Sequence, residues 1–223
     1  MKNSRQHAQR LRKLHKGLKR AHSKIEPVNH EDPIDALIYG VVSERMSASA
    51  AETAMKRLRR TFINWNDLRV SRAEEIVEAI GDDSPRGRAM ALTVTTALRS
   101  VFDIHHTVSL QSLKKLGKRP ARQTVEKLDG ISRFTVDYCM LTSLQAHAVP
   151  LTEPMLEYLK RHDIVDAQAE QAEIEGFLTR HVAAKSAYEF YALLRQECEC
   201  PRMDDKKKRK RAPRKTRRTT KAK

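Results

Sequence analysis

Apolar residues recur at three- and four-residue spacing along most of this chain, and this periodicity limits its fold more than any other feature. After Asp32-Pro33, a typical helix start, one apolar face is formed by Ile34, Leu37, Ile38, Val41 and Val42. Similar patterns predict helices over residues 48–62, 71–80 and 89–102, with a shorter one over 110–116. The β-branched residues lie inside this helical periodicity and do not alternate, so no sheet is expected. The sequence predicts an all-α fold.

Residues that commonly cap or end helices support these boundaries. Ser71 is expected to cap a helix, with Glu74 completing the capping box, and Gly81 is expected to end it. Trp65-Asn66-Asp67 is expected to be a turn, and Pro150 to Pro154 interrupt the helical pattern. Beyond that interruption, helices are predicted to begin at residue 155 and to cover residues 167–182 and 186–197.

The positive charge is concentrated at the two ends of the sequence. The chain of 223 residues has a net charge of +16, yet residues 1–24 hold nine Lys or Arg and residues 206–223 hold twelve, with no acid in either segment. Residues 25–205 hold 23 basic residues against 28 acids, a net charge of −5. We therefore expect a basic N-terminal segment (1–24), a helical domain (25–205) and a disordered Lys/Arg-rich tail (206–223).

These ends suggest a polyanionic partner, because clustered Lys and Arg neutralise phosphates. The N-terminal segment places Leu11, Leu14 and Leu18 at helical spacing, so it could become a basic helix on a polyanion. No apolar run is long enough to span a bilayer, and the basic start lacks an apolar signal region. Together with three cysteines, an odd number, this composition predicts a protein inside the cell, cytoplasmic and associated with the nucleoid or chromatin.

A predicted helical hairpin over residues 123–146 is the most specific motif. Helices over 123–128 and 133–146 are joined by Asp129-Gly130-Ile131-Ser132. Glycine takes a positive φ without steric cost, and the N–H groups of such a turn, with the following helix N-terminus, can hold a phosphate. Many helix pairs are joined through glycine, however, so this turn by itself is equally compatible with a purely structural connection.

The surroundings of this hairpin resemble the endonuclease III-like superfamily of base-excision DNA glycosylases, from about Asp32 to Glu197. The family hairpin L-P-G-V-G-R-K-T-A corresponds to Leu128 through Val136, and the family segment P-V-D-T-H-V-L-R-V-L-K-R is similar to Pro150 through Arg161. The segment Val41-Val42-Ser43-Glu44-Arg45 is similar to the family's L-L-S-x-Q, and Arg86-Gly87-Arg88-Ala89 to the turn before its long helix. The resemblance implies a two-lobed helical fold.

The resemblance also implies site residues. Backbone N–H groups near Gly130 and Ser132 would grip one phosphate of double-stranded DNA, with Arg133 adding charge. Arg88 would also contact DNA. Arg45 stands where the family places a wedge residue that fills the gap left by an extruded base, so it would enter the duplex or pair with a phosphate.

Two departures concern the family's catalytic residues. The lysine that forms a Schiff base in bifunctional members falls on Phe134, which has no amine, so lyase chemistry by that route is excluded. The catalytic aspartate falls on Thr152, which stays neutral. Glu153 is the only adjacent carboxylate, and one residue along a helix start points about 100° away. It is therefore a weak catalytic candidate, more simply explained as a partner of the helix dipole.

The function predicted from these residues is DNA binding by a relative of the base-excision glycosylases that lacks their usual chemistry. One alternative is an active but atypical monofunctional glycosylase that uses Glu153, Asp137 or a water held by Thr152. Another is a DNA-compacting or interaction protein that acts through its basic tails. No iron-sulphur cluster is expected, because the family's cluster needs four cysteines, and no metal site is predicted. Protein partners are left open.

Overall fold

The computed structural model describes residues 4–23 and 25–199, and every described element is helical. The α-helices are α1 (Ser4–Ala21), α2 (Pro33–Arg45), α3 (Ala48–Thr61), α4 (Trp65–Val70), α5 (Ala73–Ile80), α6 (Pro85–His105), α7 (Lys118–Glu126), α8 (Arg133–Thr142), α9 (Glu153–Arg161), α10 (Gln171–His181) and α11 (Ala187–Glu199). Two short 3-10 helices are η1 (Gln111–Lys115) and η2 (Ala184–Ser186). The all-α prediction is confirmed. The predicted tail over residues 206–223 lies outside the described residues.

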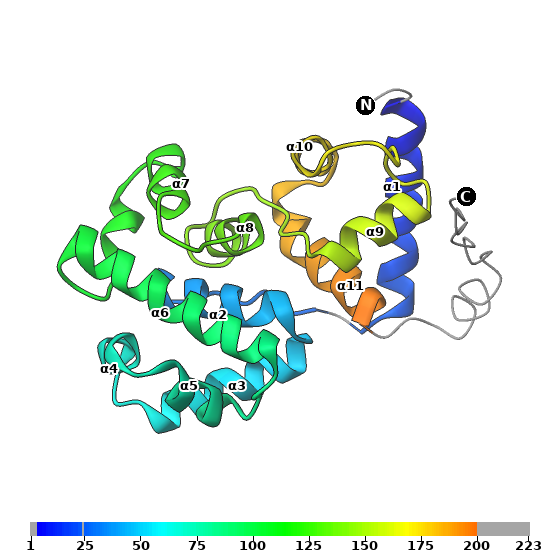
Figure 1. Ribbon diagram of the computed structural model, residues 1–223. Coiled ribbons are helices and arrows are strands. Elements are labelled where there is room, and N and C mark those ends of the chain that lie inside the picture. Colours follow the sequence, from blue (N-terminus) through cyan, green and yellow to red (C-terminus); the bar gives the residue numbers. More distant parts are fainter. Residues whose placement is uncertain (1–3, 24, 200–223) are drawn as a thin grey trace, which may run out of the picture.

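The helices form two lobes (Figure 1). In one lobe α2 packs against α3, α6 and α8, while α4 and α5 cover α6. The other lobe contains α9, α10 and α11 together with α1. Although α1 is the first helix of the chain, it packs on the last one, α11. Helix α8 lies between the lobes and contacts both α2 and α11. The second helix of the predicted hairpin is therefore at the junction of the two lobes.

The first basic segment is part of this fold, contrary to the expectation of a tail that becomes helical on a polyanion. Ala8, Leu11 and Leu18 of α1 are buried in the core. The basic side chains of the same helix also contact the second lobe: Arg10 donates to the carbonyl of Asp163 at 2.9 Å, and Lys19 lies 2.5 Å from Glu189. The apolar spacing was visible in the sequence, but the α11 surface that covers it was not.

Local boundaries follow the capping residues. Asp32 caps α2 by accepting from the N–H of Ile34, and Gly81 ends α5 with a φ of +78°. Two expectations were wrong. Trp65-Asn66-Asp67 begins α4, since the Asn64 side chain accepts from two N–H groups of this segment. The N-cap of α5 is Arg72, not Ser71, and the side chain of Glu75 accepts from the Arg72 N–H at 3.3 Å.

Candidate nucleic-acid interface

The predicted hairpin is present and consists of α7, the turn from Lys127 to Ser132, and α8. Gly130 has a φ of +74°, the left-handed conformation that the motif was expected to need. Ser132 caps α8, because its hydroxyl accepts from the N–H of Thr135 at 3.1 Å. The turn rests on α6: the Asp129 N–H donates to the Ser100 hydroxyl at 3.2 Å. The Ser132 cap and the contact with α6 thus hold the hairpin in place, while Asp129 and Gly130 at its tip remain exposed.

The tip presents N–H groups that the fold itself does not use. The hydrogen bonds among the described residues include none donated by the N–H groups of Gly130, Ile131 or Ser132. These groups immediately precede the N-terminus of α8, where the helix dipole adds partial positive charge. Consecutive exposed N–H groups at a helix start form a binding site for an oxyanion such as a phosphate.

Helix α2 packs closely against α8, the second helix of the hairpin. A Cβ atom on Gly40 would come 2.9 Å from Thr135 Cγ2, so α2 reaches α8 only because this residue lacks a side chain. Arg45 ends α2 five residues later, about 7.5 Å along the helix axis. Its side chain is exposed and makes no hydrogen bond or ion pair to another described residue. A free cation therefore projects from the end of the helix that supports the hairpin.

The other two predicted arginines are already paired. Arg133 lies 2.6 Å from Glu175 of α10, and Arg88 lies 2.8 Å from Asp83. Arg88 lies on α6 five residues before Thr93, and Thr93 and Thr96 are the side chains nearest to Gly130. Arg88 and Asp83 are both exposed, and an exposed ion pair contributes only about 0–1 kcal/mol, so exchange of this carboxylate for a phosphate is inexpensive. Glu175 is buried, so a phosphate contact by Arg133 is favoured only where Arg133 keeps its pairing with Glu175.

Phe134 does not face an open site. It is 2 % exposed and its ring stacks near Tyr138 and Tyr191, with centroids 6.2 Å away in each case. Tyr39 stacks on Tyr138 at 5.0 Å, and His30 lies 3.0 Å from the Tyr138 hydroxyl. Burial raises the pKa of Tyr138 well above its usual range. This aromatic cluster (His30, Tyr39, Phe134, Tyr138 and Tyr191) fills the space around Phe134.

The pair Thr152 and Glu153 lies at the start of α9. Thr152 is 8 % exposed and is the N-cap residue of α9, although its side chain makes no capping hydrogen bond. Glu153 is the first residue of α9 and is exposed to solvent. This position suits a carboxylate that interacts with the helix dipole. Of this pair, Thr152 is neutral and nearly buried, and the carboxylate of Glu153 is exposed to water.

A carboxylate that could carry proton chemistry lies elsewhere. Asp137, on α8, is 3 % exposed and 2.7 Å from Arg122 of α7. Burial raises the pKa of Asp137 to about 6, against the opposing effect of Arg122. A cavity of about 520 Å³ between α7, α8 and α10 is lined by both residues and by Arg133, His147 and Glu175. Its acids and bases are mutually paired, which favours a structural role for this cluster.

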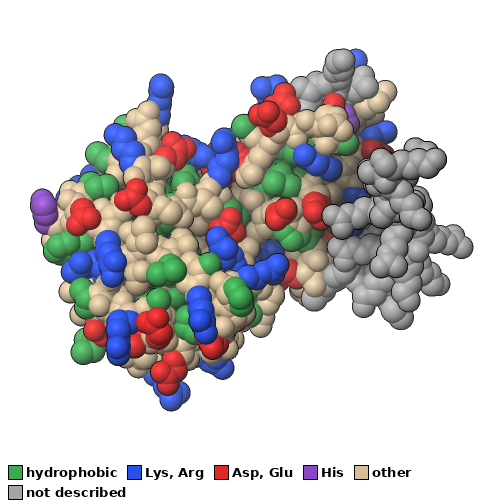
Figure 2. All heavy atoms as spheres, viewed as in Figure 1, with side chains coloured by type: hydrophobic (Ala, Val, Ile, Leu, Met, Phe, Trp, Pro, Cys, Tyr) green, Lys and Arg blue, Asp and Glu red, His purple; other side chains and the backbone are tan. Residues whose placement is uncertain are grey.

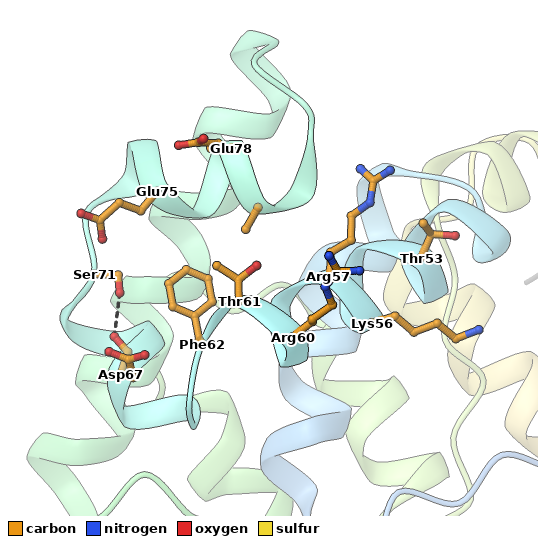
Figure 3. Close-up of a pocket in the computed structure, with 11 residues that line it drawn as sticks. Thr53, Lys56, Arg57, Arg60, Thr61, Phe62, Asp67, Ser71, Glu75 and Glu78 are labelled. Atoms are coloured by element: carbon orange, nitrogen blue, oxygen red, sulfur yellow. Dashed lines mark hydrogen bonds between the residues drawn. The ribbon is translucent and has the colours of Figure 1, made fainter.

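The basic face of α3 is another candidate for anion binding. A cavity of about 780 Å³ is lined by Lys56, Arg57 and Arg60 of α3 and by Glu75 and Glu78 of α5. Figure 3 shows these residues on the two neighbouring helices. Arg57 is already used within the fold, because it donates to the Ile80 carbonyl at 2.8 Å. Figure 2 likewise shows Lys and Arg interleaved with Asp and Glu over the visible face. Charge alone therefore singles out no surface of the described fold.

The described residues contain two of the chain's three cysteines. The iron-sulphur cluster of the similar family takes four thiolates, and this chain has three cysteines in all. Cys139 lies inside α8, where burial raises the pKa of its thiol to about 12. Cys198 is near the end of α11, and Cys200 is outside the described residues. Within residues 4–23 and 25–199, no group of three or more His, Cys, Asp or Glu side chains is arranged to hold a metal ion.

One residue at the interface was not predicted. Arg195 of α11 is buried, and its guanidinium donates to the carbonyls of Ser43 and Met46, which flank Arg45, at 2.5 and 2.9 Å. A basic residue next to Leu193 and Leu194, on a face that is otherwise apolar, is the signal that could have identified it.

No helix among the described residues has the length and apolarity of a membrane span.

Solved structures share this fold. Over 88 % of this chain and 86 % of the other, it superposes on endonuclease III trapped as a covalent intermediate with DNA, with a TM-score of 0.67 at 17 % identity. An 8-oxoguanine glycosylase/lyase from Clostridium acetobutylicum, in complex with double-stranded DNA, superposes with a TM-score of 0.66 at 13 % identity. The match covers 89 % of this chain and 71 % of the other. A thermostable thymine-DNA glycosylase superposes with a TM-score of 0.57 at 14 % identity, over 78 % of each chain.

These likenesses confirm the predicted architecture. The chain has the two-lobed helix-hairpin-helix fold of the DNA glycosylases, the fold of endonuclease III. Neither a family model nor a curated protein sequence matches it. At such low identity the shared fold leaves the activity of this chain to be argued from its own residues.

Proposed function

We propose that this protein binds double-stranded DNA through its hairpin and the end of α2, and that it lacks the usual glycosylase and lyase chemistry. The proposal depends mainly on one observation: the unpartnered N–H groups of Gly130, Ile131 and Ser132 at the start of α8. They would grip one phosphate of the duplex, and Arg133 and Arg88 would add charge on either side. Structures with this fold, among them the glycosylase/lyase above, have been solved with double-stranded DNA.

Arg45 supplies the second contact in this proposal. It is the exposed, unpaired cation at the end of α2, and α2 is packed against the hairpin helix through Gly40. A guanidinium there would enter the gap left by a missing or displaced base, or pair with a neighbouring phosphate. The basic residues of 206–223 would add affinity that is independent of sequence and falls with salt, by about 0.9 log unit per log salt for each phosphate neutralised.

The absence of the usual chemistry is supported by the two substituted positions. Phe134 has no amine and is enclosed by the aromatic cluster, so it can form no Schiff base with a sugar. Thr152 offers no negative charge to a developing sugar cation, and Glu153 faces solvent. We further propose that the protein works without an iron-sulphur cluster or metal and is associated with the nucleoid or chromatin.

Gly130 provides the test, with DNA binding by the full-length protein as the measurement. Valine cannot easily adopt a positive φ, whereas asparagine tolerates it, so Gly130→Val should weaken binding to a 20-base-pair duplex about tenfold and Gly130→Asn should not. Gly81 has a similar φ of +78° but ends α5, so Gly81→Val controls for general strain. Equal binding by the Gly130→Val variant and the wild type would refute a hairpin contact and favour binding through the tails alone.

The alternative of an active, atypical glycosylase is favoured by Asp137. Its pKa of about 6 is suitable for general acid-base catalysis at neutral pH, and it lines an open cavity beside Arg133. This reading requires Arg122 to release the carboxylate when DNA binds. Base loss that survives Glu153→Gln and is abolished by Asp137→Asn would establish it.

A further inference from the structure

We infer that Arg195 of α11 is a positioning residue that presents Arg45 to DNA, so that the second lobe controls the wedge carried by the first. This inference rests on the proposed function, because it assigns a role to the same interface. The turn between α2 and α3 is only two residues long, Met46 and Ser47, and Arg45 immediately precedes it. Without an external support, the last residue of a helix and such a turn would fray.

The support comes from a buried guanidinium. One terminal nitrogen of Arg195 donates to the carbonyls of Ser43 and Met46, at 2.5 and 2.9 Å. These acceptors lie two residues before and one residue after Arg45. Ser43 belongs to the last turn of α2, whose carbonyls have no partner within the helix, and Met46 directly follows that helix. Arg195 therefore fixes the backbone on both sides of Arg45 without touching its side chain.

A carboxylate completes the clamp from the other side of the turn. The Nε of Arg195 donates to Glu199 at 2.7 Å, and the two oxygens of Glu199 accept from the N–H of Ala48, the first residue of α3, at 3.0 and 3.1 Å. The same pair of α11 residues thus caps the end of α2 and the start of α3. The turn is held as one rigid unit, with Arg45 at its exposed edge.

Arg195 also connects this turn to the hairpin helix. Its guanidinium carbon lies 5.9 Å from the centre of the Phe134 ring of α8, and its other terminal nitrogen donates to the Tyr191 hydroxyl at 2.7 Å. A lysine in place of Phe134 would put a second cation beside this guanidinium. The substitution that removes the family's nucleophile is therefore the one that permits a buried arginine here, and the resulting cluster holds the two proposed DNA contacts in a fixed relation.

The test uses full-length protein and a 20-base-pair duplex with a central abasic site flanked by 2-aminopurine, whose fluorescence rises when a side chain unstacks it. Wild type should bind this duplex in preference to the intact one and raise the fluorescence. Arg195→Met should lose most of the fluorescence rise, and its preference for the abasic duplex over the intact one should fall about tenfold. Arg45→Ala should have the same two effects. Binding of Arg195→Met to the intact duplex should change less than about threefold. Arg195→Lys should restore part of both signals, because an ammonium group can still donate to the two carbonyls.

The double variant distinguishes positioning from a general structural effect. If Arg195 acts through Arg45, Arg45→Ala combined with Arg195→Met should be no worse than Arg45→Ala alone. Arg10→Met, which removes a guanidinium that donates to a backbone carbonyl in the second lobe, away from the hairpin and the turn, is the matched control and should keep the preference. Should Arg195→Met prove too unstable, Glu199→Gln, which weakens the same clamp, should also lower the fluorescence rise.

The outcomes separate the two proposals. Additive losses in the double variant, or an Arg195→Met protein that keeps the full preference, would overturn the positioning role while leaving DNA binding by the hairpin intact. Wild type that binds neither duplex would overturn the proposed function itself, and the positioning role with it.

Discussion

Gly40 of α2 and Thr135 of α8 are so close that a Cβ atom on Gly40 would lie 2.9 Å from Thr135 Cγ2 and 3.2 Å from Thr135 Cα. Thr135 is also the residue whose N–H is capped by Ser132, so this contact lies directly behind the hairpin. The two elements proposed to contact DNA thus meet at one backbone approach. The packing of this pair sets the distance between the hairpin tip and Arg45.

Gly40→Ala should therefore destabilise the protein. The added methyl group has to displace α8 or α2, and overpacking of this kind costs about 1–3 kcal/mol. Urea denaturation followed by circular dichroism measures the change in the free energy of unfolding. Gly176→Ala is the matched control, because nothing lies within 4 Å of its would-be Cβ on α10. That substitution should stabilise the protein by about 0.4–1 kcal/mol through helix propensity. Equal effects of the two substitutions would contradict the close approach.

Asp137 should make stability depend on pH in a direction opposite to that of most carboxylates. Its pKa is raised by burial to about 6 in the folded protein, so the folded state binds the proton more tightly than the unfolded state. The free energy of unfolding should therefore fall as pH rises from about 4 to 6, by up to about 3 kcal/mol from this group.

Comparison with Asp137→Asn isolates this contribution, since the other carboxylates are shared. The difference in unfolding free energy between the variant and the wild type should grow over that pH interval and stay constant above about pH 7. Parallel pH profiles would show that Asp137 keeps its ordinary pKa.

A lysine at position 134 should not give the protein lyase activity. Phe134→Lys puts an ammonium group into the aromatic cluster near Arg195, and an unpaired buried charge costs on the order of 3 kcal/mol or more. We expect a lower melting temperature and no covalent adduct with abasic DNA under borohydride. Phe134→Leu, which keeps the position apolar, should lose much less stability. A trapped adduct with Phe134→Lys would mean that the position faces an accessible site.

The sequence predicted the hairpin well because its determinants are local. Gly130 and Ser132 act within a few residues of themselves, as do Asp32 and Gly81, which bound α2 and α5. The all-α architecture followed from helical periodicity, and its two lobes from the resemblance to the endonuclease III-like superfamily. Helix bounds were predicted less well: the first hairpin helix, expected over residues 123–128, is Lys118–Glu126, and α8, expected to reach residue 146, ends at Thr142. The turn at Trp65 and the cap of α5 were also wrong.

The remaining features depend on partners far away in the sequence. Arg195 contacts carbonyls about 150 residues earlier, and α1 is ordered by a surface of α11 at the other end of the described chain. The pairing of Arg133 with Glu175 likewise joins α8 to α10. Sequence spacing carries no record of which helices meet, so these side chains could be identified as basic or acidic but not as paired.

The central claim, DNA binding without the usual chemistry, is tested most directly by single-turnover incubation of the full-length protein with duplexes that carry uracil, oxidised or alkylated bases, or an abasic site. Binding is measured beside base loss and strand cleavage. The account predicts tight binding, strongest at the abasic site, with neither base loss nor cleavage on any duplex. Base loss that disappears with Glu153→Gln or Asp137→Asn would contradict it and establish an active glycosylase.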